Sequence, residues 1–347
     1  MSGKKTRGKN HAQRQDSQDE VENILIRKRL KEGKNFFEEG NYIEAIEKFA
    51  MVIGTARNDQ ARQYLARCFY RLEKYEKAYD HFLYLADHAT GEMKDYAVSM
   101  IATIEEMHGN IDKAIKILRD LPKSTKNLIN LSIMYWKKYK AENSDYSVRE
   151  AMSLLDQVQF EDINDSLKKR VFHLRALIYQ TQNEHRLAKG FYKRAIKLAD
   201  NDVAEGRILN DYASLFLERK EFDKARELLD QARTLVKGKS KVEEAFNNKW
   251  TGFLLVSLKE FKESKTYLES AAKVLREKDL LEEAAVIDFI MAKLTRDEDF
   301  YKAAEYFAKG IYYEKMSEEV TDRDEKILDF YLDSFFGDDN SDSGTSG

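Results

Sequence analysis

The stretch that decides the fold is Gly33-Lys-Asn-Phe36-Phe-Glu-Glu-Gly40-Asn-Tyr42-Ile-Glu-Ala45-Ile-Glu-Lys-Phe49. Small and large apolar residues recur in it at helical spacing on both sides of Gly40. Glycine adopts the left-handed backbone conformation that ends a helix without strain. The stretch therefore predicts two amphipathic helices joined by a tight turn, with small residues where the helices cross and large residues beside them.

The pattern of the second helix recurs along the chain. It opens with Tyr42, Tyr75, Ile111, Val148, His185, Phe222, Phe261 and Phe300. Three residues later comes a small side chain, at Ala45, Ala78, Ala114, Ala151, Ala188, Ala225, Ser264 and Ala303. Four residues further comes a large one, at Phe49, Phe82, Leu118, Leu155, Tyr192, Leu229, Leu268 and Phe307. The small residues are 33, 36, 37, 37, 37, 39 and 39 positions apart, which predicts an array of about eight helix pairs.

The first helix of each pair follows the same rule less strictly. Nine residues before the opening position stand Gly33, Ala66, Ala102, Ala176, Ala213 and Gly252. In the fourth copy we expect an expanded turn over residues 141–145, which shifts this register, and Met291 blurs the pattern in the eighth.

Composition supports an all-α chain and bounds its setting. One proline and 15 glycines among 347 residues are too few for many turns or sheets. A net charge of −3 excludes a strongly basic DNA-binding domain. Cys68 is the only cysteine, so no internal disulfide forms, and no apolar run is long enough for a membrane span or a signal peptide. We expect a cytoplasmic protein.

The repeated pattern resembles the tetratricopeptide repeat, over roughly residues 25–315. Gly33, Phe36, Gly40, Tyr42, Ala45 and Phe49 match that motif, as do Ala66, Phe69, Tyr75, Ala78 and Phe82. The resemblance implies a right-handed α-solenoid that binds proteins or peptides. Two departures are the missing closing proline, since Pro122 is the only proline, and repeats longer than the usual 34 residues.

The ends of the chain differ from the array. Residues 1–20 form a predicted disordered basic arm, and residues 21–320 form the repeat superhelix. Residues 321–336 predict a helix that caps the last repeat, because Ile327, Leu328, Tyr331, Leu332, Phe335 and Phe336 follow helical spacing. Residues 337–347 form an acidic disordered tail. The basic residues within 4–14 leave contact with RNA or an anionic membrane open, beside the simpler reading of a solubilising tail.

The sequence contains no pattern that predicts catalysis. It lacks a glycine-rich phosphate loop, a His-Glu-x-x-His motif and paired metal-binding cysteines. Cys68 fits a packing position between Arg67 and Phe69. We therefore expect no enzyme activity, no cofactor and no metal, and function must come from a surface.

The first helices line the inner face of such a solenoid. Counting from the small residue of each first helix, the inward positions of repeats five to seven form a polar, basic row with two aromatic side chains beside it: Arg170, His173, Arg207, Asn210, Lys249, Phe246 and Phe253. Arginine binds a carboxylate through two hydrogen bonds, and asparagine both donates to and accepts from a peptide backbone. The row predicts a site for an acidic segment or a C-terminal carboxylate, whereas the plainer reading is a solvated helix face.

These observations favour a non-catalytic scaffold or adaptor that binds a protein or peptide. The alternative is a peptide-responsive regulator, because repeats of this length also resemble the peptide-sensing regulators of Gram-positive bacteria. Those regulators usually carry an N-terminal DNA-binding or effector domain, and only about 25 residues precede the first repeat here. DNA is not expected as a partner. A chaperone-tail clamp is disfavoured, since its Lys and Asn would fall at Leu30 and Lys34.

Overall fold

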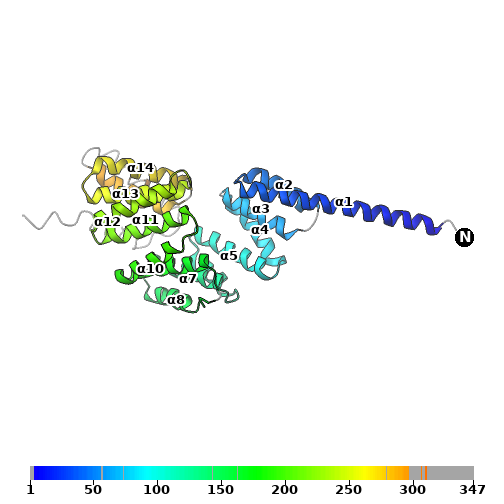
Figure 1. The fold of residues 1–347 in the computed structure, drawn as a ribbon, viewed down its shortest axis with the longest axis horizontal. Coiled ribbons are helices and arrows are strands. Elements are labelled where there is room, and N and C mark those ends of the chain that lie inside the picture. Colours follow the sequence, from blue (N-terminus) through cyan, green and yellow to red (C-terminus); the bar gives the residue numbers. More distant parts are fainter. Residues whose placement is uncertain are drawn as a thin grey trace, which may run out of the picture. The chain divides into compact units, whose positions relative to one another are not determined.

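In this computed structural model, the described residues are 4–55, 58–72, 74–142, 144–161, 163–278, 280–296, 306 and 309–310. Within them the chain forms fifteen helices and no strand (Figure 1). The helices are α1 (Lys4–Glu38), α2 (Tyr42–Thr55), α3 (Asp59–Arg71), α4 (Tyr75–His88), α5 (Gly91–Met107), α6 (Ile111–Arg119), α7 (Thr125–Glu142), α8 (Asp145–Asp156), α9 (Asp165–Thr181), α10 (His185–Lys197), α11 (Asp202–Glu218), α12 (Phe222–Val236), α13 (Lys241–Ser257), α14 (Phe261–Glu277) and α15 (Leu281–Thr295). The all-α expectation is confirmed.

The helices belong to two compact units. Unit 1 comprises residues 1–105 and 116–122, and unit 2 comprises residues 106–115 and 123–347. Consecutive helices pack as hairpins, α1 on α2 and α3 on α4 in unit 1, and α7 on α8, α9 on α10, α11 on α12 and α13 on α14 in unit 2. In unit 2 the first helices also contact one another, as α9 does α11 and α11 does α13.

The turn inside each pair repeats one backbone geometry. A residue with positive φ precedes the second helix at Gly40 (φ 82°), Gly109 (81°), Asn183 (59°), Lys220 (57°) and Lys259 (62°). The amide N–H that follows it caps the first helix by donating back to a carbonyl, as Asn41 does to Phe36 over 2.8 Å. Second helices consequently begin at the predicted opening residues, for example at Tyr42 and Phe222.

The core consists of the side chains that the repeat pattern selects. The small residues from Ala45 to Ser264 are fully buried, and the large residue four positions later is buried in every described repeat. Small size matters most at Gly33, where a Cβ atom would lie 2.8 Å from the Phe49 ring, and at Gly252, where it would lie 2.5 Å from Leu268. These glycines let the first helix approach the second closely enough to bury its large side chain.

Three details differ from the sequence expectations or fall outside the description. α1 begins at Lys4, so the backbone of residues 4–20 continues a helix where we expected a disordered arm, because no proline interrupts this stretch. The fourth turn is short rather than expanded, since α7 runs to Glu142 and α8 begins at Asp145. The capping helix 321–336, the tail 337–347 and most of the second helix of the eighth repeat lie outside the described residues.

Candidate functional site

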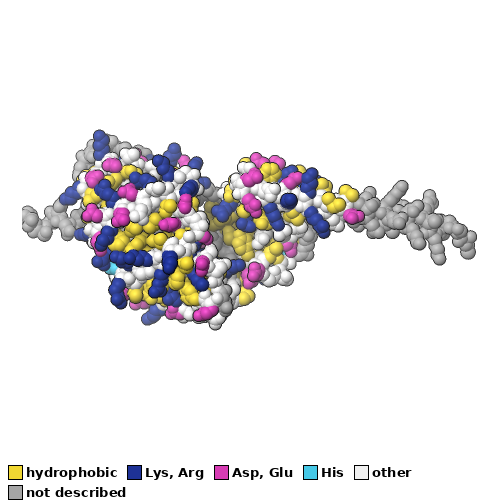
Figure 2. All heavy atoms as spheres, in the orientation of Figure 1, with side chains coloured by type: hydrophobic (Ala, Val, Ile, Leu, Met, Phe, Trp, Pro, Cys, Tyr) yellow, Lys and Arg dark blue, Asp and Glu magenta, His cyan; other side chains and the backbone are white. Residues whose placement is uncertain are grey.

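The predicted row lies on the first helices of unit 2, and its members differ in accessibility. α9 carries Arg170 and His173, α11 carries Arg207 and Asn210, and α13 carries the remaining three residues. We call the solvent-facing side of α7, α9, α11, α13 and α15 the first-helix face of unit 2. Where Figure 2 shows side chains in colour, basic and acidic groups are interspersed.

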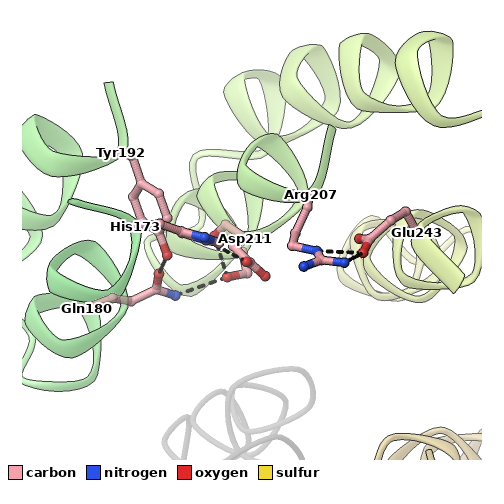
Figure 3. Close-up of polar contacts among 7 residues, drawn as sticks. His173, Gln180, Tyr192, Arg207, Asp211 and Glu243 are labelled. Carbon is pink, nitrogen blue, oxygen red and sulfur yellow. Dashed lines mark hydrogen bonds and ion pairs between the residues drawn. The ribbon is translucent and has the colours of Figure 1, made fainter. Parts of the chain in front are cut away.

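Arg170 and His173 are the members of the row on α9. Arg170 is exposed, and its Nη2 donates to Asn130 Oδ1 of α7 over 3.1 Å. That partner is neutral, so it does not offset the positive charge of the guanidinium. His173 is half-buried, and its Nε2 lies 2.8 Å from Asp211 Oδ2 of α11 (Figure 3). Arg170 is therefore the row's accessible cation without an acidic partner among the described residues.

Arg207 and Asn210 both bind Glu243, a buried residue of α13. Arg207 Nε donates to Glu243 Oε1 over 2.6 Å (Figure 3), and the Arg207 side chain is 60% exposed whereas that of Glu243 is 3% exposed. Burial raises the pKa of Glu243, and Arg207 partly offsets this effect. Asn210 is buried, and its Nδ2 donates to the Glu243 carbonyl over 3.2 Å. Asn210 thus holds α13 and cannot contact a peptide backbone in this arrangement.

A second asparagine, which the sequence analysis did not select, completes this junction. Asn247 Nδ2 donates to Asn210 Oδ1 over 2.9 Å and to the Leu229 carbonyl over 2.8 Å. Its Oδ1 accepts from Arg233 Nε over 3.2 Å. Each atom of the buried amide is satisfied, which is the condition under which a buried polar group stabilises a junction. The 37-residue step between the two asparagines is two residues shorter than the 39-residue step between these repeats, so counting by repeat position selects Lys249 instead of Asn247.

The three predicted residues on α13 are less accessible than expected. Lys249 is 5% exposed and its Nζ donates to Glu283 Oε2 over 2.5 Å, while its ammonium group lies 4.1 Å from the Trp250 ring centroid. Phe246 is half-buried. Phe253 is fully buried, so its assignment to a surface pocket is wrong. The position after Gly252 turns toward the core because that glycine lets α13 lie against α14.

Cations of more than one first helix act on Glu283 of α15. Burial acts to raise the pKa of Glu283 on α15, but Lys249 of α13 and Lys140 and Lys137 of α7 outweigh it and lower this pKa. The helices α7 and α15 are separated by three intervening first helices in the array. The charges of α7 therefore act on a carboxylate of α15 across the first-helix face of unit 2.

The basic row is largely neutralised by a ladder of ion pairs between successive first helices. Each rung joins a basic side chain on one first helix to an acid on the next: His173 with Asp211, Arg207 with Glu243, and Lys249 with Glu283. The expected run of free positive charge is therefore mostly paired. The ladder links neighbouring repeats, and a ligand must either use Arg170 or exchange with a rung.

A polar chain lies beside the ladder at the end of α9. Tyr192 Oη donates to Gln180 Oε1 over 2.6 Å (Figure 3). Gln180 Nε2 donates to Glu218 Oε1 over 2.6 Å and to Ser214 Oγ over 3.0 Å. Burial raises the pKa of Glu218 to about 7, although the side chain retains access to solvent.

Replacing Glu218 by Gln should stabilise the protein at alkaline pH. The folded state holds the Glu218 proton up to a pKa of about 7, whereas the unfolded state loses it near 4.5, so wild-type stability falls as pH rises through this interval. The gain of the variant should be at most about 1 kcal/mol, since solvent screens the exposed side chain. Thermal denaturation at pH 5 and pH 8 measures it, with Glu227→Gln on α12 as the control. An equal effect of Glu218→Gln at both pH values would contradict the assignment.

Two other observations bear on chemistry. Burial raises the pKa of the Cys68 thiol to about 12, so this thiol stays protonated at neutral pH and serves packing in unit 1. Across the part of the chain that the structure describes, no group of three His, Cys, Asp or Glu side chains is arranged to hold a metal ion. In the same part, every helix is too short or too polar to cross a bilayer.

Comparison with known proteins defines the fold. No protein-family model matches the sequence, and the search of curated proteins found no relative. Among solved structures, the chain is similar to NprR in complex with its cognate peptide NprX, with 15% identity, a TM-score of 0.60, and coverage of 88% of this chain and 94% of that one. The apo form of the quorum sensor NprR from B. thuringiensis gives 14% identity, a TM-score of 0.54, and coverage of 90% and 94%.

A third similar structure is named for its fold. It is a tetratricopeptide repeat protein from Parabacteroides merdae, with 13% identity, a TM-score of 0.50, and coverage of 83% of this chain and 99% of that one. These similarities span nearly the whole of each solved chain. Together with the repeated helix pairs, they show that the chain is a tetratricopeptide-repeat protein in its fold.

Proposed function

We propose that this protein is a non-catalytic, cytoplasmic scaffold or adaptor that binds a protein segment or peptide on the first-helix face of unit 2. The observation that carries the proposal is the array of polar side chains on successive first helices, at about the spacing of the repeats. An extended peptide matches such a surface because its backbone and side chains also present polar groups at regular intervals. The similarity in fold to a peptide-bound NprR supports the same kind of ligand.

The chemistry of the face favours an acidic segment or a C-terminal carboxylate at Arg170. Its guanidinium is exposed and bonded to the neutral Asn130, so it can form two hydrogen bonds with a carboxylate. Arg207 is also accessible, but a ligand carboxylate there competes with Glu243. Phe246 offers half-buried apolar contact area on α13. The buried residues Asn210, Lys249 and Phe253 contribute indirectly, by stabilising the packing of the helices that carry this surface.

Replacing Arg170 by Glu should weaken peptide binding by about tenfold or more, since it removes one charge-assisted interaction and adds repulsion. Peptides selected from a displayed library against the wild-type chain supply the ligand, and fluorescence anisotropy gives the affinity. Arg226→Glu, on the second helix α12, makes the same charge change away from the face and should leave affinity unchanged. Equal affinity of wild type and Arg170→Glu would remove Arg170 from the site.

A peptide-responsive regulator is the second candidate, and the ion-pair ladder favours it. Each rung spans two repeats, so a ligand that displaces one acid alters the contact between those repeats. Scattering measurements with and without the selected peptide separate the two functions. Compaction on binding supports a regulator, whereas an unchanged scattering curve together with stable retention of a protein partner supports a scaffold.

A further inference from the structure

Three basic residues on the first helices of unit 1 lack the acidic partners that neutralise several first-helix cations of unit 2. Lys34 on α1 and Arg67 on α3 are half-buried, and Arg71 on α3 is exposed. None of these three side chains forms an ion pair with another described residue. By contrast, Lys28 and Lys48 of unit 1 both pair with Glu32. The first-helix cations Lys137, Arg207 and Lys249 of unit 2 are all neutralised by acids.

Aromatic rings hold the unpaired cations of unit 1 in place. The Arg67 guanidinium lies 4.4 Å from the Phe37 ring centroid and 5.0 Å from that of Tyr64, and Lys34 Nζ lies 5.4 Å from the Tyr64 centroid. A ring face stabilises a cation without neutralising it. Stacking leaves the N–H groups at the edge of a guanidinium available to a hydrogen-bond acceptor.

The third first helix of unit 1 contributes to the same surface. Burial raises the pKa of Tyr96 on α5, while the charges of Arg67 and Arg71 act to lower it. A phenol supplies one further hydrogen-bond donor for an anion. We call Lys34, Arg67 and Arg71, with Phe37, Tyr64 and Tyr96, the cationic face of unit 1.

We propose that the cationic face of unit 1 is a second binding surface, which takes a segment of Asp and Glu residues from a partner protein. Charge complementarity carries this assignment: three positive charges on two adjacent helices lack acids, and a carboxylate satisfies a guanidinium edge or an ammonium group in the geometry they present. This surface is separate from the face of unit 2 and does not depend on the proposed function of that face.

Single-stranded RNA fits these residues less well. Nucleic-acid surfaces of this kind combine cations with open ring faces on which bases stack. Here Arg67 lies over Phe37, and Tyr64 is stacked on Phe49 with centroids 5.2 Å apart. The rings are therefore engaged with cations and the core. Carboxylates need only the cation edges, which remain available.

The test is fluorescence anisotropy with the full chain and a labelled peptide of alternating Glu and Gly, against the matching Gln and Gly peptide and an oligo(U) probe. Wild type should bind the Glu peptide in preference to both others, with affinity that falls as salt rises. Arg67→Glu and Lys34→Glu should each lower affinity for the Glu peptide by about tenfold. Lys31→Glu, at an exposed position of α1 outside the face, is the matched control.

Folding and site are separated by further variants. Circular dichroism checks each protein, and Arg67→Gln replaces Arg67→Glu if the latter does not fold. Arg170→Glu should leave binding of the Glu peptide to unit 1 intact, because Arg170 belongs to unit 2. Failure of the unit 2 proposal would instead appear as unchanged affinity of Arg170→Glu for the library-selected peptide. Unchanged affinity in both Lys34→Glu and Arg67→Glu, loss confined to Arg170→Glu, or preference for oligo(U) would each overturn the proposal.

Discussion

Replacing Arg276 by Met is expected to lower the free energy of unfolding by about 3–5 kcal/mol at pH 7, because it leaves a buried charge without its partner. Asp288 on α15 is 1% exposed and pairs with Arg276 of α14. Burial raises the pKa of Asp288, and Arg276 acts against this effect. Urea denaturation followed by circular dichroism measures the loss, and Arg276→Met/Asp288→Leu should recover most of it because the double variant buries no charge.

The effect of Arg276→Met should depend on pH in a defined direction. Without the guanidinium, the pKa of Asp288 rises further above its unfolded value, so the folded state binds the proton more tightly. The variant then gains stability as pH falls and loses it as pH rises through the interval between the two pKa values. Its deficit relative to wild type should therefore shrink from pH 7 to pH 4. A deficit that is constant with pH would mean that lost packing, rather than the uncompensated charge, causes it.

Replacing Lys249 by Glu should cost about 3 kcal/mol of stability, since it sets two carboxylates against each other at a site where the lysine is buried. The ammonium group bonds to Glu283 over 2.5 Å and lies over Trp250. The charge swap Lys249→Glu/Glu283→Lys should restore much of the loss, because the pair is rebuilt in the opposite sense. Urea denaturation of wild type and the single and double variants measures both effects.

This prediction separates a structural role of Lys249 from a binding role. If the ammonium group holds α13 against α15, the single variant is unstable and the swapped pair is rescued. If Lys249 instead binds the ligand, the single variant keeps its stability and loses affinity. The second result would return Lys249 to the binding site that the sequence predicted.

The fold could be predicted from the sequence because its decisive residues report local geometry. Ala45, Ala78 and their successors mark helix crossings, and Gly40 marks a turn that needs positive φ. Each signal depends on neighbours within one repeat, so spacing alone reveals it. The prediction for the fourth turn was wrong because the shifted spacing between its two helices was interpreted as a longer loop. In the structure the extra residues belong to the helices: α7 extends to Glu142, and α8 begins three residues before Val148.

The site was predicted less well because accessibility depends on neighbouring repeats. Position counting placed Arg170, Arg207 and Lys249 on equivalent sides of three helices. It could not show that Glu243 and Glu283, more than thirty residues away, would pair with two of them. Phe253 became core for a similar reason, since Gly252 brings α14 close to it. The neutral partner of Arg170 and the paired cations are properties of inter-repeat packing, which has no short-range pattern.

The turn geometry has a consequence for how far such a chain can diverge in evolution. The hydrogen bond that closes each turn joins main-chain atoms, as between Asn41 and Phe36, Glu184 and Tyr179, and Glu221 and Phe216. The residue with positive φ is glycine in some repeats and asparagine or lysine in others. Because any amino acid supplies a backbone amide and carbonyl, mutation can replace most side chains around a turn without abolishing it. Only the small residue at each helix crossing resists exchange. The fold can therefore be retained after sequence similarity between related chains has been lost.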